Sequence, residues 1–105
     1  MYDGTSVTEY LKSTHDTPLL SEREKHLVGL AVTLTRGCQV CSRNRIDKAR
    51  SAGIGDDLLN ALVGIVAAVN AGVSAATARE AFRLADAAPQ EPCADLCSPA
   101  GRDGR

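Results

Sequence analysis

The apolar positions of this chain recur at helical spacing almost throughout. In the middle of the chain they follow i, i+3, i+4 and i+7, as in Leu27, Leu30, Ala31 and Leu34, and residues 58–69 repeat the pattern. The alternation of two that marks a strand does not occur in the sequence. The pattern predicts a compact all-α domain of about five helices, placed at residues 6–14, 22–36, 38–52, 57–71 and 74–87.

Polar residues and glycines mark the predicted helix ends. Ser6 and Glu9, and again Ser21 and Glu24, have the spacing of a capping box, in which hydroxyl and carboxylate each accept a free backbone N–H. Glycine readily adopts the left-handed conformation that ends a helix. Three glycines stand where the predicted helices need such a stop: Gly37, Gly53 and Gly72.

Two of the predicted helices are apolar on more than one side. The segments LVGLAVTL (27–34) and LLNALVGIVAAV (58–69) leave almost no polar face, and a chain of 105 residues has little other surface to cover them. In one arrangement, the first and last helices cover both segments within a small bundle. We favour the other arrangement, in which further copies of the chain cover them, and expect a homo-oligomer.

Length and composition favour one domain followed by a tail. With 105 residues and 44% apolar content, the chain suffices for one modest core, which we assign to residues 1–88. Residues 89–105 are rich in proline and glycine and have no periodic apolar face. The net charge is −1 with both signs interspersed, so charge indicates no nucleic-acid partner.

The N-terminal residues contain no basic stretch followed by an apolar one, and the longest apolar run, 61–69, is shorter than a membrane span. We therefore expect a cytoplasmic protein without a membrane segment. In that setting, four cysteines point to catalytic, redox-sensing or metal-binding thiols rather than to a disulfide scaffold.

Two of these cysteines, Cys38 and Cys41, directly follow Gly37. The predicted helix places Cys38 at its N-cap or first turn and Cys41 at the end of that turn, where the helix dipole stabilises thiolates. Arg45, four residues after Cys41, lies on the same face of the predicted helix as the two cysteines. It can therefore hold a positive charge over the Cys41 sulfur. The pair could perform redox chemistry, form half of a metal site or simply pack, and its place at a helix start favours redox chemistry.

A histidine on the preceding helix is a candidate for proton transfer. His26 lies twelve residues before Cys38, and a tight turn at Gly37 would fold the two helices together. Glu22, four residues before His26, has the spacing to accept a hydrogen bond from the imidazole and raise its basicity. The alternative is a surface histidine with a helical partner. His15 has no such partner, and we expect it to face solvent.

Residues 20–72 resemble the carboxymuconolactone decarboxylase family in its alkylhydroperoxidase D-like branch. The resemblance rests on the order of elements: a charged helix start, a Leu/Ala-rich helix, Gly-Cys-x-x-Cys, an Ala-Gly stop and a buried Ala/Val helix. It implies an all-helical fold and assembly as a homotrimer or homohexamer. For the enzyme we expect no bound cofactor or metal. The resemblance also implies reduction of a small hydroperoxide through a disulfide cycle, with a dithiol electron donor such as a lipoyl group.

Two positions depart from that branch. Its proton relay uses a glutamate at the position of His26 and a histidine at the position of Arg45, next to the second cysteine, Cys41. Arginine does not exchange protons at ordinary pH, although it can stabilise a thiolate. The sequence therefore predicts a thiol-dependent peroxidase or disulfide oxidoreductase, an antioxidant enzyme, with a rearranged relay of Glu22, His26 and Cys41.

A second pair, Cys93 and Cys97, lies in the tail outside the resemblance. These residues are exposed thiols, an electron shuttle to the first pair, or ligands of a metal shared with it. Two alternatives to the enzyme thus stay open. One is a protein that binds zinc or a soft metal through both pairs, and the other is a non-catalytic family member with altered relay residues.

Overall fold

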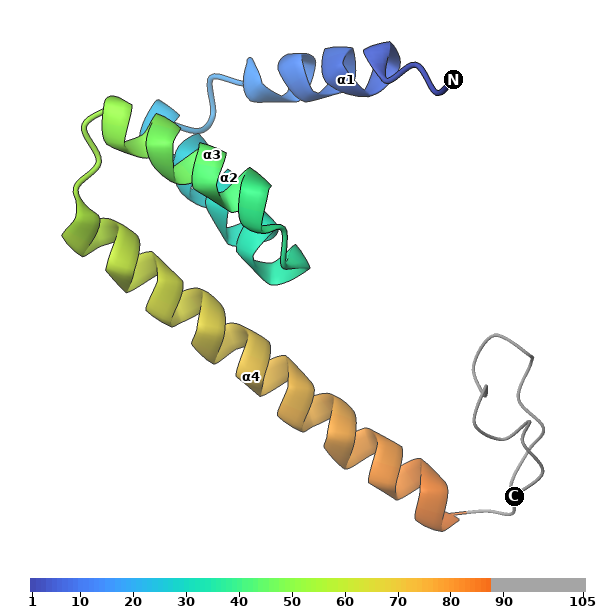
Figure 1. Cartoon of the computed structure of the whole chain (residues 1–105). Helices are drawn as coiled ribbons and strands as arrows, with labels where there is room; N and C mark the ends of the chain where they lie inside the picture. Colours follow the sequence, from blue (N-terminus) through green and yellow to red (C-terminus); the bar gives the residue numbers. More distant parts are fainter. Residues whose placement is uncertain (88–105) are drawn as a thin grey trace. The chain divides into compact units, whose positions relative to one another are not determined.

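The computed structural model describes residues 1–87, and this part of the chain is all helical (Figure 1). The prediction of an all-α fold is confirmed. The described residues form four helices rather than five: α1 (Thr5–His15), α2 (Glu22–Arg36), α3 (Gln39–Ser51) and α4 (Asp56–Ala87).

The difference lies in α4, which joins the two last predicted helices into one of 32 residues. Gly72 was expected to end a helix, but within residues 1–87 only Gly37 and Gly53 have a positive φ. Ala71 precedes Gly72, and Ala75 and Ala76 follow it within about one turn. These residues favour the helix, so one glycine, at a cost of about 1 kcal/mol relative to alanine, does not interrupt it. A glycine ends a helix only where the residues around it also favour a stop.

The two predicted capping boxes have different outcomes. At α2 the box is formed: Glu24 N–H donates to Ser21 Oγ over 3.0 Å, and Ser21 N–H donates to Glu24 Oε1 over 2.8 Å. At α1 the helix begins before Ser6, and the Asp3 carboxylate accepts the Thr5 N–H over 3.0 Å. Hydrogen bonds from Thr5 hold the pKa of Asp3 below its ordinary value. The predicted Ser6 box was therefore wrong.

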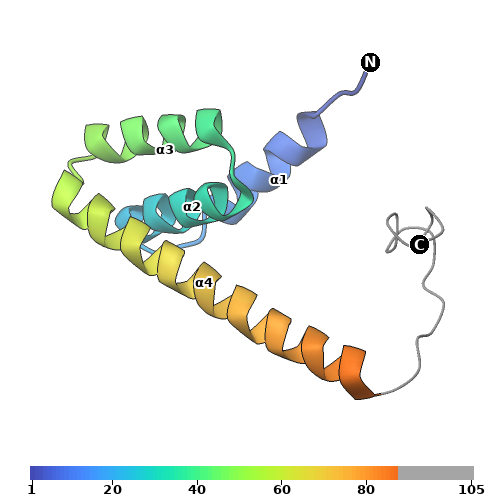
Figure 2. The same cartoon turned by 60° about the horizontal axis from the view of Figure 1, so that its bottom comes forward.

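Helices α2 and α3 form an antiparallel hairpin and lie side by side (Figure 2). Gly37 turns the chain with a φ of 80°, as predicted, and its N–H donates to Thr33 and Leu34 carbonyls at the end of α2. Across the hairpin, Ser42 Oγ donates to Thr33 Oγ1 over 3.0 Å. This bond satisfies a buried hydroxyl and fixes the register of the first turn of α3 against α2.

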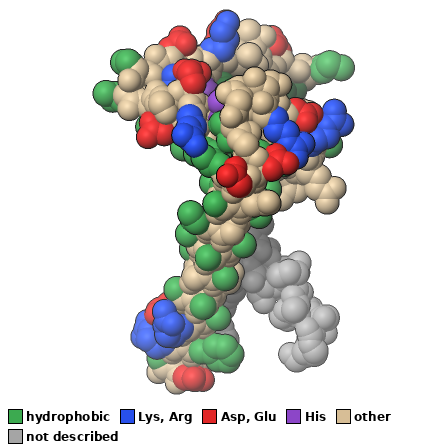
Figure 3. Space-filling model, turned by 90° about the vertical axis from the view of Figure 1, so that its left-hand side faces the viewer, with side chains coloured by type: hydrophobic (Ala, Val, Ile, Leu, Met, Phe, Trp, Pro, Cys, Tyr) green, Lys and Arg blue, Asp and Glu red, His purple; other side chains and the backbone are tan. Residues whose placement is uncertain are grey.

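The core of the described residues is small. Its buried apolar side chains come from α2, α3, the following turn and α4: Leu30, Ala49, Ile54 and Leu59. By contrast, much of the apolar surface of α4 faces outward in the single chain (Figure 3), with Ile65 63% and Val69 59% exposed. This exposure is large for aliphatic side chains.

The chain divides into two units, residues 1–71 and 72–105. The first contains the hairpin and the core. The described part of the second is the C-terminal half of α4, where Arg83 forms an ion pair with Glu80. The hydrogen bond from Arg83 holds the pKa of Glu80 below its ordinary value.

Because α4 is continuous, it is also long and apolar enough to cross a membrane, with a mean hydropathy of 1.8 over 18 residues. The sequence-based expectation rested on a shorter apolar run within 57–71 and did not foresee this. The same length and composition suit a helix covered by other protein subunits.

Candidate redox site

The structure joins Cys38 and Cys41 in a disulfide at the N-terminus of α3, with their Cα atoms 5.4 Å apart. Cys38 is the N-cap residue, as predicted, and its Sγ accepts the backbone N–H of Cys41 over 3.2 Å. A sulfur in this position replaces the usual hydroxyl or carboxylate cap and lies at the positive end of the helix dipole. Both sulfurs therefore lie where negative charge is stabilised once the bond is reduced.

The two cysteines line different cavities. Cys38 is half-buried and lines a cavity of about 570 Å³ with Gln39 and Ile46. Cys41 is exposed and lines a cavity of about 500 Å³ on the α1 side, together with His15 and Arg45. Cys41 is thus the more exposed residue of the pair, and the residues that line its cavity come from α1, α2 and α3.

Arg45 lines the cavity of Cys41. Its guanidinium also packs on α2, because a Cβ built on Gly29 would fall on the guanidinium atoms. Gly29 therefore leaves space for the arginine between the two helices. This close approach explains a glycine in the middle of α2, where glycine weakens a helix.

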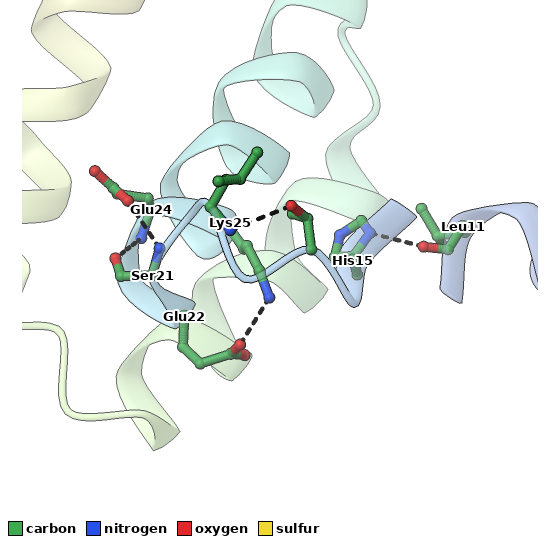
Figure 4. A network of polar contacts seen from close by, with 8 residues as sticks. Leu11, His15, Ser21, Glu22, Glu24 and Lys25 are labelled. Carbon is green, nitrogen blue, oxygen red and sulfur yellow. Dashed lines mark hydrogen bonds and ion pairs between the residues drawn. The ribbon is translucent and has the colours of Figure 1, made fainter. Parts of the chain in front are cut away.

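His26 and Glu22 do not meet in the predicted way. Glu22 accepts a hydrogen bond from Lys25 Nζ over 3.0 Å (Figure 4), and the structure has no hydrogen bond between Glu22 and His26. This bond and the charge of Lys25 hold the pKa of Glu22 below its ordinary value, with a smaller effect of His26. Lys25, three residues after Glu22 on the same face of the helix, has a long and flexible side chain that reaches the carboxylate.

His26 lines a cavity at the far end of the hairpin, with Gly53 and Ile54. The antiparallel arrangement brings the start of α2 to the end of α3, whereas the cysteines lie at the start of α3. The cavity that contains Cys41 does not include His26. The structure therefore brings together Cys38, Cys41 and Arg45, but places His26 and Glu22 elsewhere.

The histidine in the cavity of Cys41 is His15, which the sequence had suggested was exposed to solvent. It is half-buried at the end of α1, and its Nδ1 lies 2.8 Å from the Leu11 carbonyl (Figure 4). Because a carbonyl oxygen only accepts, Nδ1 carries a proton, and Nε2 is the acceptor of the neutral ring. No spacing in the sequence indicates that His15 lines the cavity of Cys41, because the loop after α1 sets the position of this residue.

The chain matches the carboxymuconolactone decarboxylase family over residues 5–87. It belongs to this family. A crystal structure of a protein from Methanobacterium thermoautotrophicum, a structural genomics target, is similar with a TM-score of 0.70 and 28% identity. The similarity covers 75% of this chain and 91% of that one. No curated protein matches the sequence.

The match to the carboxymuconolactone decarboxylase family extends beyond the resemblance seen in residues 20–72. It includes α1, and therefore His15 and Lys12, and the whole of α4. The helix that lines the cavity of Cys41 is consequently part of the family domain rather than an appended segment.

Within residues 1–87, no group of three or more His, Cys, Asp or Glu side chains is arranged to hold a metal ion. A four-thiolate site would require Cys93 and Cys97, and both lie outside the described residues. The predicted roles of that pair, as exposed thiols, shuttle or ligands, therefore stay predictions.

Proposed function

We propose that this member of the carboxymuconolactone decarboxylase family is a thiol-dependent peroxidase of the alkylhydroperoxidase D-like kind, reducing small hydroperoxides through Cys41 and Cys38. One observation carries the proposal: the two cysteines bond to each other at a helix N-terminus, and the exposed Cys41 opens onto a cavity. A sulfur pair that cycles between dithiol and disulfide needs both features.

In the proposed cycle, the Cys41 thiolate attacks the terminal oxygen of the hydroperoxide. The O–O bond breaks, the remaining alkoxide takes a proton and leaves as an alcohol, and Cys41 becomes a sulfenic acid. The Cys38 sulfur then attacks the Cys41 sulfur, water leaves, and the disulfide forms. A small dithiol donor, of the lipoyl type in the related branch, returns two electrons and two protons and is itself oxidised to a disulfide.

The alkoxide needs a proton donor, and the cavity of Cys41 contains one titratable imidazole. We assign this proton transfer to His15: its Nε2, the acceptor of the neutral ring, takes the proton of the Cys41 thiol and then returns it to the alkoxide. Its place in that cavity and the Nδ1 contact that fixes its tautomer support the assignment. Arg45 supplies a fixed positive charge near the thiolate. The relay through His26 and Glu22 stays the competing prediction.

The test is steady-state reduction of cumene hydroperoxide with dihydrolipoamide as donor, comparing the parent with Cys41→Ser and Cys38→Ser. The proposal expects multiple turnovers for the parent and none for Cys41→Ser. Cys38→Ser should react once and stop as a sulfenic acid that dimedone traps. A parent with no turnover for any hydroperoxide and dithiol tried would contradict the proposal.

We also propose that the active form is a homo-oligomer, a trimer or hexamer, in the cytoplasm, where reduced dithiols are available. The support is the exposed aliphatic surface of α4 beside a core of four enclosed apolar residues. Burial of such surface is the main favourable term in subunit association.

A further inference from the structure

The cavity beside Cys41 is lined by positive charge. Lys12 from α1 and Arg45 and Lys48 from α3 supply this charge, and His15 lines the same cavity. None of the described residues that line it is acidic. Lys12, Arg45 and Lys48 also form no ion pair within residues 1–87. Three cations thus surround one reactive sulfur without a countercharge from the described part of the chain.

The other side of α3 differs. The cavity of Cys38 is also lined by arginines, but each has an acidic partner. Arg43 lies 3.8 Å from Asp47, and Arg50 donates two hydrogen bonds, of 2.8 and 2.9 Å, to the Asp56 carboxylate. The arginines beside Cys38 are therefore paired with carboxylates. The cations beside Cys41, the more exposed cysteine, have no acidic partner among the described residues.

We propose that the cavity beside Cys41 binds an anionic group of the substrate, and that the hydroperoxide is one that bears a carboxylate. This inference rests on the proposed function. Unpaired cations around a cavity attract anions and raise their local concentration, and guanidinium and ammonium groups are the usual partners of carboxylates. Leu11 and Thr33 line the same cavity and could contact the apolar part of such a molecule.

The redox balance is unchanged by this assignment. The carboxylate takes no part in bond making and remains ionised throughout. The hydroperoxide group is reduced to an alcohol and water, while Cys38 and Cys41 lose two electrons and two protons and form their disulfide. The cations contribute by holding the substrate with its O–O bond near the Cys41 sulfur.

The first test needs no peroxidase activity. Reduced protein is alkylated with iodoacetate, an anion, and with iodoacetamide, its neutral analogue, and the rate at Cys41 is measured by peptide mass spectrometry. The ratio of the two rates should fall about 3–10-fold in Lys12→Gln/Lys48→Gln, since two cations are removed. The control, Arg23→Gln/Arg43→Gln, loses the same charge away from this cavity and should keep the parent ratio.

The second test uses cumene hydroperoxide bearing a para carboxylate and the methyl ester of the same compound. The parent should prefer the carboxylate, measured as the ratio of kcat/KM for the two compounds, and the double lysine variant should lose that preference. High salt should weaken the preference in the parent. Dihydrolipoate and dihydrolipoamide, compared as donors, form the third arm.

The outcomes separate the two proposals. An alkylation ratio that does not respond to the lysines would overturn the anion site, whatever the peroxidase assay gives. A charge preference seen only with dihydrolipoate would overturn the assignment to the hydroperoxide, because the anion would belong to the donor. Failure of both hydroperoxides to oxidise the thiols, with an alkylation ratio that does respond, would remove the proposed function alone.

Discussion

The guanidinium of Arg45 occupies the space that a Cβ on Gly29 would fill. This contact joins the middle of α2 to the helix that carries the cysteines. It predicts that a single methyl group on α2, remote from the sulfurs in sequence, changes the electrostatics at Cys41.

In Gly29→Ala, the flexible end of Arg45 should move aside rather than the backbone. Alanine is the better helix former by about 1 kcal/mol, so the free energy of unfolding should rise by about 0.5–1 kcal/mol. Alkylation of reduced Cys41 should slow at neutral pH, since the cation has moved. Urea denaturation and alkylation rates check both effects. A stability loss above about 1 kcal/mol would mean that Arg45 is held in place.

The matched control is the double variant Gly29→Ala/Arg45→Ala. Its alkylation rate should equal that of Arg45→Ala alone, because the methyl group has no guanidinium left to displace. A further slowing in the double variant would show that Gly29 acts on the sulfur by another route.

We expect substitutions of the two histidines to affect hydroperoxide turnover differently. His15→Gln should slow hydroperoxide turnover by roughly 10²–10⁴-fold, as expected for the loss of a general acid, and His26→Gln should have little effect. In both variants, diamide should still form the disulfide between Cys38 and Cys41. The opposite order of turnover rates would restore the relay through His26.

The turn between α3 and α4 predicts a pH effect on stability. Hydrogen bonds from Arg50 hold the pKa of Asp56 below its ordinary value. The pair therefore stabilises the fold above the unfolded-state pKa of the aspartate, and this contribution is lost as pH falls through the lower folded-state value. In Arg50→Gln, NMR titration should show the Asp56 pKa rising toward its ordinary value. The difference in melting temperature between the variant and parent should vanish in acid.

If the protein is an oligomer that covers α4, a charged side chain on the apolar surface of this helix should disrupt the assembly. Ile65 is 63% exposed in the single chain, so glutamate there would cost a monomer little. In an oligomer that covers α4, Ile65→Glu should instead dissociate the assembly, as measured by light scattering at micromolar concentration. Asn60→Glu adds the same charge at an exposed polar position on α4 and serves as the control. A parent that runs as a monomer would contradict the oligomer.

The sequence predicted features that depend on neighbours along the chain. Gly37 in its left-handed conformation, the Ser21 cap and Cys38 at the N-cap are local, and all were confirmed. The prediction that Gly72 ends a helix was wrong, because the helix propensity of the alanines before and after it exceeds the cost of one glycine.

The residues around Cys41 required tertiary structure. Whether His15 or His26 accompanies the sulfur depends on how the loop after α1 places that helix and on the register of the hairpin, and neither follows from spacing. Glu22 had two possible partners at helical distance, and the structure pairs it with Lys25. Local sequence thus located the cysteine pair, while packing selected its neighbours.

The most direct test of the central claim is a single turnover of the reduced protein. Reduced parent, freed of donor, is mixed with excess cumene hydroperoxide, and the peptide containing Cys38 and Cys41 is followed by mass spectrometry alongside the alcohol product. The account predicts loss of two hydrogens from that peptide as one molecule of alcohol forms per chain, with no alcohol from Cys41→Ser. Thiols of Cys38 and Cys41 that stay reduced in excess hydroperoxide would contradict it.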